Sequence, residues 1–165
     1  MSEEQRRFIW FQVIAAALFN LVLNGVIAWL MFHGAPPMPM WARGPSVGFD
    51  TVGTSFFLPL ITCLVLTKVV RGQVAAGKAP ALAASPTVAL WRWLPHGTLA
   101  RGAVIGLTCA LSIGPATAVA LQGAGFALMT GLQIVWFKAL YGAALAALVT
   151  VPITHWALSP APPRA

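Results

Sequence analysis

The sequence predicts an all-α integral membrane protein, a bundle of four transmembrane helices with both termini on the cytoplasmic side. The first observation is composition: 59% of the 165 residues are hydrophobic and 8% are charged, whereas about one-quarter of the residues of a globular domain are charged. The second is a mean hydropathy of +0.82. Together they exclude a soluble enzyme, a disordered chain and a disulfide-rich secreted domain.

The third observation is a set of four long apolar segments. They cover residues 8–32, 49–70, 102–121 and 132–158. Each reaches the length of about 20 residues that an α-helix needs to cross the hydrocarbon core of a bilayer. Their apolar residues do not alternate with a period of two, and a helix satisfies its backbone polar groups internally, so we expect helices rather than strands. We expect residues 1–165 to form a single transmembrane domain.

The first apolar segment has a competing interpretation as a cleavable signal peptide. Arg6 and Arg7 precede it, as the basic region of such a peptide would. However, the apolar stretch is much longer than the roughly 7–15 residues of a signal-peptide core. The prolines at positions 36 and 37 also make a poor cleavage site. We therefore expect an uncleaved membrane anchor.

The distribution of Lys and Arg predicts the orientation of the bundle. Eight basic residues fall in the N-terminal tail, in or beside the connection 71–101, or in the C-terminal tail: Arg6, Arg7, Lys68, Arg71, Lys78, Arg92, Arg101 and Arg164. The loop 34–48 contains only Arg43, and the loop 122–131 contains no basic residue. Because basic loops stay on the cytoplasmic side, we expect the connection 71–101 and both termini there, in the plasma (inner) membrane.

Three amide side chains form a row in the first segment. Gln12, Asn20 and Asn24 are spaced by multiples of four residues, so they share one face of a helix. Amides that face lipid are costly, and the row should face protein or water. Two interpretations stay open: hydrogen bonds between helices, which are common in bundles, or the lining of a substrate path.

Small residues form rows in the third and fourth segments. They are Gly102, Gly106, Ala110 and Gly114 in the third, and Gly142 and Ala146 in the fourth. Such rows let helices approach closely, so we expect them to pack against other helices. We also expect the third segment to be the most tightly packed, either central in the monomer or at a dimer seam.

Prolines interrupt two of the predicted helices. Pro59 lies in the second segment and Pro115 in the third, directly after Gly114. A proline inside a helix removes one backbone hydrogen bond and kinks the helix. Both are candidate hinges, although a static bend is the alternative. Thr108 and Ser112 are placed to satisfy carbonyl groups freed near Pro115.

Lys138 in the fourth segment is the most informative polar residue. It lies roughly 10 Å in from the outer end of its helix, where a lysine needs a named partner. Asp50, the only acid outside the N-terminal tail, begins the second segment on the same side. We expect the two to pair, with Tyr141 one turn away as a further hydrogen-bond partner. The alternatives are a Lys138 that extends to the headgroups, an Asp50 that caps its helix, and a purely structural salt bridge.

The sequence lacks the residue patterns of a catalytic or cofactor site. Cys63 and Cys109 lie inside predicted helices without a CxxC motif, and His33, His96 and His155 are scattered. We therefore expect neither a metal site nor a haem or other cofactor. Nucleic-acid binding is not expected either, because the basic residues follow membrane topology.

Three functions are compatible with this pattern. The first is a non-catalytic membrane subunit that assembles with itself or with a larger complex through small-residue helix faces. The second is an oligomeric transporter or channel for a small solute or ion, lined by the amide row and the Asp50–Lys138 pair. The third is an intramembrane enzyme, which we place last because no catalytic constellation is present. The bilayer is the one partner common to all three.

Overall fold

The computed structural model describes residues 2–80, 95 and 97–159, and its elements are helical except for two short strands. The helices are α1 (Glu3–Phe32), α2 (Val47–Ala75), α4 (Thr98–Leu111), α5 (Ile113–Gly123) and α6 (Gly131–Leu158). Since α4 and α5 together form one membrane-length unit, the described chain contains four helical segments long and apolar enough to cross a membrane. The all-α fold with four membrane-length helices is therefore confirmed, whereas the cytoplasmic location of the termini stays a prediction.

The helices extend beyond the apolar segments that predicted them. Ser2 caps α1 by accepting a hydrogen bond from the backbone N–H of Gln5, so that α1 starts five residues before residue 8. At its other end α2 continues to Ala75, beyond residue 70. Hydropathy detects only the part of a helix that matches the hydrocarbon core, and capped polar turns extend it into the interface.

The connection predicted over residues 71–101 is consequently too long. Helix α2 occupies its first residues and α4 its last ones, which leaves residues 76–97 between them. Arg101 thus belongs to a helix rather than to a loop, and only 1% of its surface is exposed. Most of the remaining connection, residues 81–94 and 96, lies outside the described residues.

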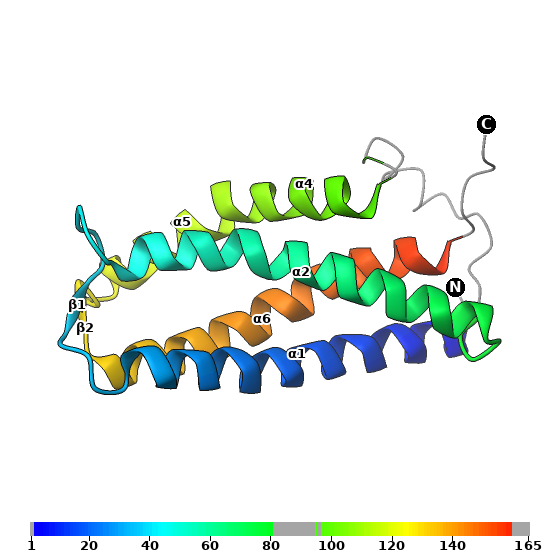
Figure 1. Cartoon of the computed structure of the whole chain (residues 1–165), viewed down its shortest axis with the longest axis horizontal. Coiled ribbons are helices and arrows are strands. Elements are labelled where there is room, and N and C mark those ends of the chain that lie inside the picture. Colours follow the sequence, from blue (N-terminus) through cyan, green and yellow to red (C-terminus); the bar gives the residue numbers. More distant parts are fainter. Residues whose placement is uncertain (1, 81–94, 96, 160–165) are drawn as a thin grey trace.

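Helix α6 lies between α1 and α2, as Figure 1 shows. It packs against α1 on one side and α2 on the other, and α2 in turn packs against α4 and α5. Half of the most apolar window of α6 is buried, compared with 28% for the α4–α5 unit and 11% for α1. The expectation that the third segment is central in the monomer is therefore wrong: that segment packs mainly on α2.

The third segment breaks near its proline. Helix α4 ends at Leu111 and α5 begins at Ile113, with Ser112 between them at φ −116° and ψ −68°. Pro115 cannot donate the backbone hydrogen bond that the Leu111 carbonyl would accept in a continuous helix. Ser112 Oγ donates to the Thr108 carbonyl and Thr108 Oγ1 to the Val104 carbonyl, so neither hydroxyl bonds to the Leu111 carbonyl, contrary to the expectation from the sequence. Pro59, by contrast, lies inside α2 without ending it.

The two ends of the bundle differ in how the chain closes them. At one end, strands β1 (Met38–Pro39) and β2 (Leu128–Met129) pair antiparallel and join the loop after α1 to the loop before α6. The start of α1 and the end of α6 lie together at the opposite end (Figure 1). We call these the β1–β2 end and the N-terminal end. Four crossings would bring these two helix ends to the same side of the membrane.

Candidate functional site

Lys138 and Asp50 form a salt bridge between α6 and α2. Lys138 Nζ donates to Asp50 Oδ2, and also to Thr54 Oγ1 over 2.9 Å. The Lys138 side chain is 10% exposed and that of Asp50 is 34% exposed. The ammonium group is thus held inside the protein, while the carboxylate remains partly open.

The structure bears on the alternative roles of these two residues to different degrees. Lys138 Nζ contacts two side chains of α2, and extension of its stem toward the headgroups is compatible with these contacts. Asp50 is not the cap of α2, because Ser46 precedes that helix and its Oγ accepts from the backbone N–H of Phe49. What remains open is whether the pair binds a ligand or serves only as a structural salt bridge.

Both residues of the pair lie near the first residues of their helices. Helices α2 and α6 have 29 and 28 residues, so each is about 42–44 Å long and exceeds the core of about 30 Å by roughly 6–7 Å at each end. Asp50 lies about 5 Å and Lys138 about 10 Å from the first residue of its helix. In a bilayer centred on these two helices and perpendicular to them, the carboxylate would lie at the interface and the lysine backbone just below it.

Tyr141 belongs to a separate contact. Its hydroxyl forms a 2.6 Å hydrogen bond with Ser55 Oγ, and its ring stacks on Phe137 with centroids 5.4 Å apart. Ser55 Oγ also donates to the Thr51 carbonyl. The structure thus brings Tyr141 to α2, one residue along from Thr54, but not onto the Asp50–Lys138 pair.

The amide row of α1 makes different hydrogen bonds from those expected between helices. Asn20 donates to the Ala16 carbonyl, and Asn24 donates to the Asn20 carbonyl, so both bond within their own helix. Gln12 alone of the three reaches another helix, where its Nε2 donates to Gln73 Oε1 over 3.2 Å. Gln12 therefore joins α1 to α2 near the N-terminal end.

A long groove separates α1 from α2 and has a volume of about 760 Å³. Its walls are one face of α1, from Gln12 to Met31, and one face of α2, from Asp50 to Val69, with lining residues at intervals of one to four positions. Lys138 lines it from α6. We call this feature the α1–α2 groove, and its volume falls in the range of about 300–1,000 Å³ that is typical of small-molecule sites.

The groove gathers the predicted polar residues in one place. Gln12, Asn20, Asn24, Asp50 and Lys138 all line it, although they come from three helices. The Asp50–Lys138 pair lies toward the β1–β2 end and Gln12 toward the N-terminal end. Between them the walls carry large apolar side chains that are about half exposed or more, such as Phe19, Phe57 and Val65. The groove is therefore apolar along its length and charged near one end.

The small-residue rows pack inside the monomer. A Cβ atom at Gly106 would lie 2.5 Å from the Phe56 carbonyl oxygen of α2, and one at Gly114 would lie 2.8 Å from Ser55 Oγ. Gly102 faces Leu60 and Cys63 of α2 in the same way, whereas Gly142 faces Asn24 of α1. Ala110 and Ala146 are buried as well. These rows bring α4–α5 against α2, and α6 against α1.

A second polar cluster, which the sequence did not predict, lies near the N-terminal end. The guanidinium carbon of Arg101 lies 2.9 Å from the centre of the Trp156 ring, and that of Arg71 lies 4.3 Å from it. Arg101 Nη2 also donates to the Pro95 carbonyl over 2.7 Å. Arg101 is counted in the sequence analysis among the residues that set the topology, and nothing in its sequence neighbourhood signals the contact with Trp156.

Two hydrogen-bond partners of the predicted polar residues are also not identified in the sequence analysis. Thr54 receives a hydrogen bond from Lys138 and lies one helical turn after Asp50, and that spacing of four residues was a usable signal. Gln73, the partner of Gln12, lies beyond the predicted end of the second segment. No sequence signal connected it to α1.

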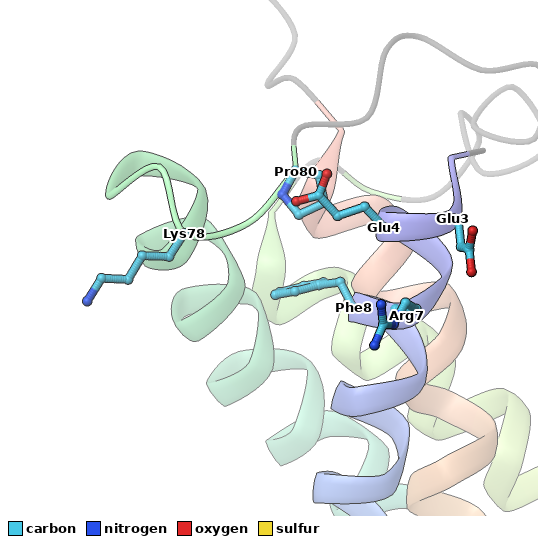
Figure 2. A pocket seen from close by; sticks show the side chains of 6 residues that line it. All are labelled: Glu3, Glu4, Arg7, Phe8, Lys78 and Pro80. Carbon is cyan, nitrogen blue, oxygen red and sulfur yellow. The ribbon is translucent and has the colours of Figure 1, made fainter.

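A smaller pocket of about 420 Å³ lies at the start of α1. Figure 2 shows its lining side chains, with Phe8 directed from α1 toward α2 and Lys78 extending away from α1. Glu3 and Glu4 balance the charges of Arg7 and Lys78. Pro80 borders it, immediately before the residues that are not described. Its mixed charges indicate no particular ligand.

A comparison of the chain with family models, curated proteins and solved structures finds no match. Functional inference therefore depends on the residues and geometry of this chain.

Proposed function

We propose that the protein is a non-catalytic membrane protein that binds one amphipathic, lipid-like molecule in the α1–α2 groove. The observation that supports the proposal is that a single groove, open along apolar walls, also holds the partly exposed ion pair. An amphipathic ligand has the same two parts. Its chain would replace bilayer lipid along Phe19, Leu23 and Ile61, and its polar head would lie at the Asp50–Lys138 pair.

The side chains at the groove favour an acyl chain over a helix of a partner protein. Interfaces between transmembrane helices are rich in small residues that allow backbones to approach closely. In this chain the rows with Gly102, Gly106 and Gly142 already pack against other helices of the monomer, and the exposed groove walls carry bulky residues such as Phe19 and Phe57. Assembly as a subunit through the small-residue rows therefore has less support than ligand binding.

Transport is the second candidate function, and one observation favours it. The groove extends along most of α1 and α2, from the ion pair near one end to the Gln12–Gln73 hydrogen bond near the other. A bound amphiphile could follow this path between leaflets in an oligomer. Binding without transport needs fewer assumptions, because the groove is open to the side rather than enclosed.

The test is photolabelling of the purified protein in nanodiscs with a phosphatidylcholine that carries a diazirine in its acyl chain. We expect labelled peptides to contain the groove faces of α1 and α2, including Leu23 and Ile61. Ala16→Trp places a large ring in the groove and should lower labelling at least about threefold. Val22→Trp is the matched control, because Val22 is 64% exposed on α1 outside the groove. Equal labelling of the Val22 and Leu23 faces, or no effect of Ala16→Trp in a folded protein, would refute the proposal.

A further inference from the structure

We infer that the ligand of the α1–α2 groove is a zwitterionic phospholipid whose ammonium group carries N–H donors, with the ammonium bound by Asp50 and the phosphate by Lys138. This inference rests on the proposed binding function and adds the chemistry of the headgroup. It follows from the unused hydrogen-bonding positions of the pair, from its net charge and from the relative depths of the two residues.

Each member of the pair has hydrogen-bonding capacity left. The lysine ammonium has three N–H donors, and two of them go to Asp50 Oδ2 and Thr54 Oγ1. Asp50 uses Oδ2 alone: within the described residues, its Oδ1 accepts no hydrogen bond, and about a third of the side chain is exposed. The site therefore offers one donor and one carboxylate oxygen to a ligand in the groove that both residues line.

The charges of the pair select against a headgroup with a net charge. A phosphate that approaches Lys138 is repelled by the Asp50 carboxylate. A lone cation that approaches Asp50 is repelled by the Lys138 ammonium group. Repulsion between like charges disfavours both ligands at this site. A zwitterion avoids it, because its ammonium neutralises the carboxylate while its phosphate faces the lysine. An ammonium with N–H groups gains a charge-assisted hydrogen bond that a trimethylated ammonium cannot form.

The depths of the two residues match the order of groups along such a lipid. Thr54 lies one turn farther from the β1–β2 end than Asp50 on α2, and Lys138 Nζ donates to both side chains, so the ammonium group lies on the side of the Asp50 carboxylate that faces away from that end. In a phospholipid the phosphate is next to the glycerol and acyl chains, and the ammonium is farther out. A lipid with its chain in the groove thus presents phosphate and ammonium in the same order as Lys138 and Asp50.

The test is native mass spectrometry of the intact protein with an equimolar mixture of phosphatidylethanolamine, phosphatidylcholine and phosphatidylglycerol that share the same acyl chains. We expect phosphatidylethanolamine to be retained about tenfold more than either competitor, the ratio that one charge-assisted hydrogen bond supplies. In Asp50→Asn, which is close to isosteric, retention of phosphatidylethanolamine should fall to that of phosphatidylcholine. Arg43→Gln, an exposed site at the same end, is the matched control and should keep the preference.

The outcomes separate this inference from the proposed function. Retention of all three lipids without preference, or a preference for phosphatidylglycerol, overturns the headgroup assignment but leaves the groove as a lipid site. A preference that survives Asp50→Asn also overturns it. If no lipid is retained and Ala16→Trp does not change photolabelling, the proposed function itself fails. Because the competition uses the unmodified chain, an unstable variant does not prevent the main test.

Discussion

The salt bridge between Lys138 and Asp50 predicts that replacing one residue lowers stability more than replacing the other, and that the two losses do not add in the double variant. In Asp50→Asn the lysine loses its counter-ion while its side chain is only 10% exposed. In Lys138→Met the carboxylate that remains is 34% exposed and lies in the first turn of α2, near the end of that helix. The unbranched Met side chain also fills the volume of the lysine stem. We therefore expect Asp50→Asn to be the more damaging of the two substitutions.

The magnitudes follow from the exposure of the pair. Exposed ion pairs contribute about 0.2–1 kcal/mol, whereas removing one partner of a buried pair costs about 3–5 kcal/mol. This pair lies between those limits, so we expect Asp50→Asn to lower the free energy of unfolding by about 2 kcal/mol and Lys138→Met by about 1 kcal/mol. The double variant should lose about 1 kcal/mol, because no isolated charge remains, which corresponds to a coupling energy of about 2 kcal/mol.

Reversible unfolding of the four proteins in mixed micelles with SDS, followed by Trp fluorescence, measures these values. Lys68→Met is the control, since it makes the same chemical change at an exposed position of α2 and should shift the free energy of unfolding by less than about 0.5 kcal/mol. Additive losses in the double variant would refute the coupling. A larger loss in Lys138→Met than in Asp50→Asn would refute the reasoning from exposure.

Three further predictions test other parts of the structure. Gly106→Ala should lower the free energy of unfolding by about 1–3 kcal/mol in the same assay, because its Cβ would meet the Phe56 carbonyl at 2.5 Å, whereas Gly53→Ala, which meets no atom within 4 Å, should be neutral or slightly stabilising. Trp156→Ala should lower the free energy of unfolding by about 3 kcal/mol, because it removes the ring under Arg101. Trp136→Ala, at a residue that is 63% exposed, should lower it by less than about 1 kcal/mol, and equal losses would contradict the prediction. In a chain with Cys63 and Cys109 replaced by Ala, a membrane-impermeant maleimide should label Arg43→Cys in intact cells and Lys78→Cys only after lysis, and the reverse pattern would invert the predicted orientation.

The number of helices could be predicted from the sequence because the bilayer constrains it. Any segment that crosses the hydrocarbon core must be apolar over about 20 residues, and hydropathy detects that property directly. The helix ends could not be predicted equally well, since the first turns of α1 are polar and depend on the Ser2 cap. For the same reason, hydropathy places Arg101 in the loop before the third segment rather than in the first turn of α4.

The salt bridge could be predicted because the chain has so few acids. Asp50 was the only candidate partner for Lys138 outside the N-terminal tail, and helix directions placed the two at the same end. The α1–α2 groove could not be predicted, because it results from the order in which helices pack. Consecutive helices α1 and α2 do not pack tightly along their length, and both pack against α6 instead. No residue pattern in the two helices specifies that choice.

The two polar clusters of the structure differ in a way that bears on which of them can bind a ligand. Arg101 is 1% exposed, stacks on Trp156 and donates to the Pro95 carbonyl, so its charge is enclosed by the protein. A charge enclosed in this way can hold helices in register but cannot meet a molecule from the bilayer. The carboxylate of Asp50, by contrast, is 34% exposed beside an apolar groove. A salt bridge with only a structural role would gain no stability from that exposure. The partial opening of this pair is therefore the reason to expect a ligand at the β1–β2 end rather than at the N-terminal end.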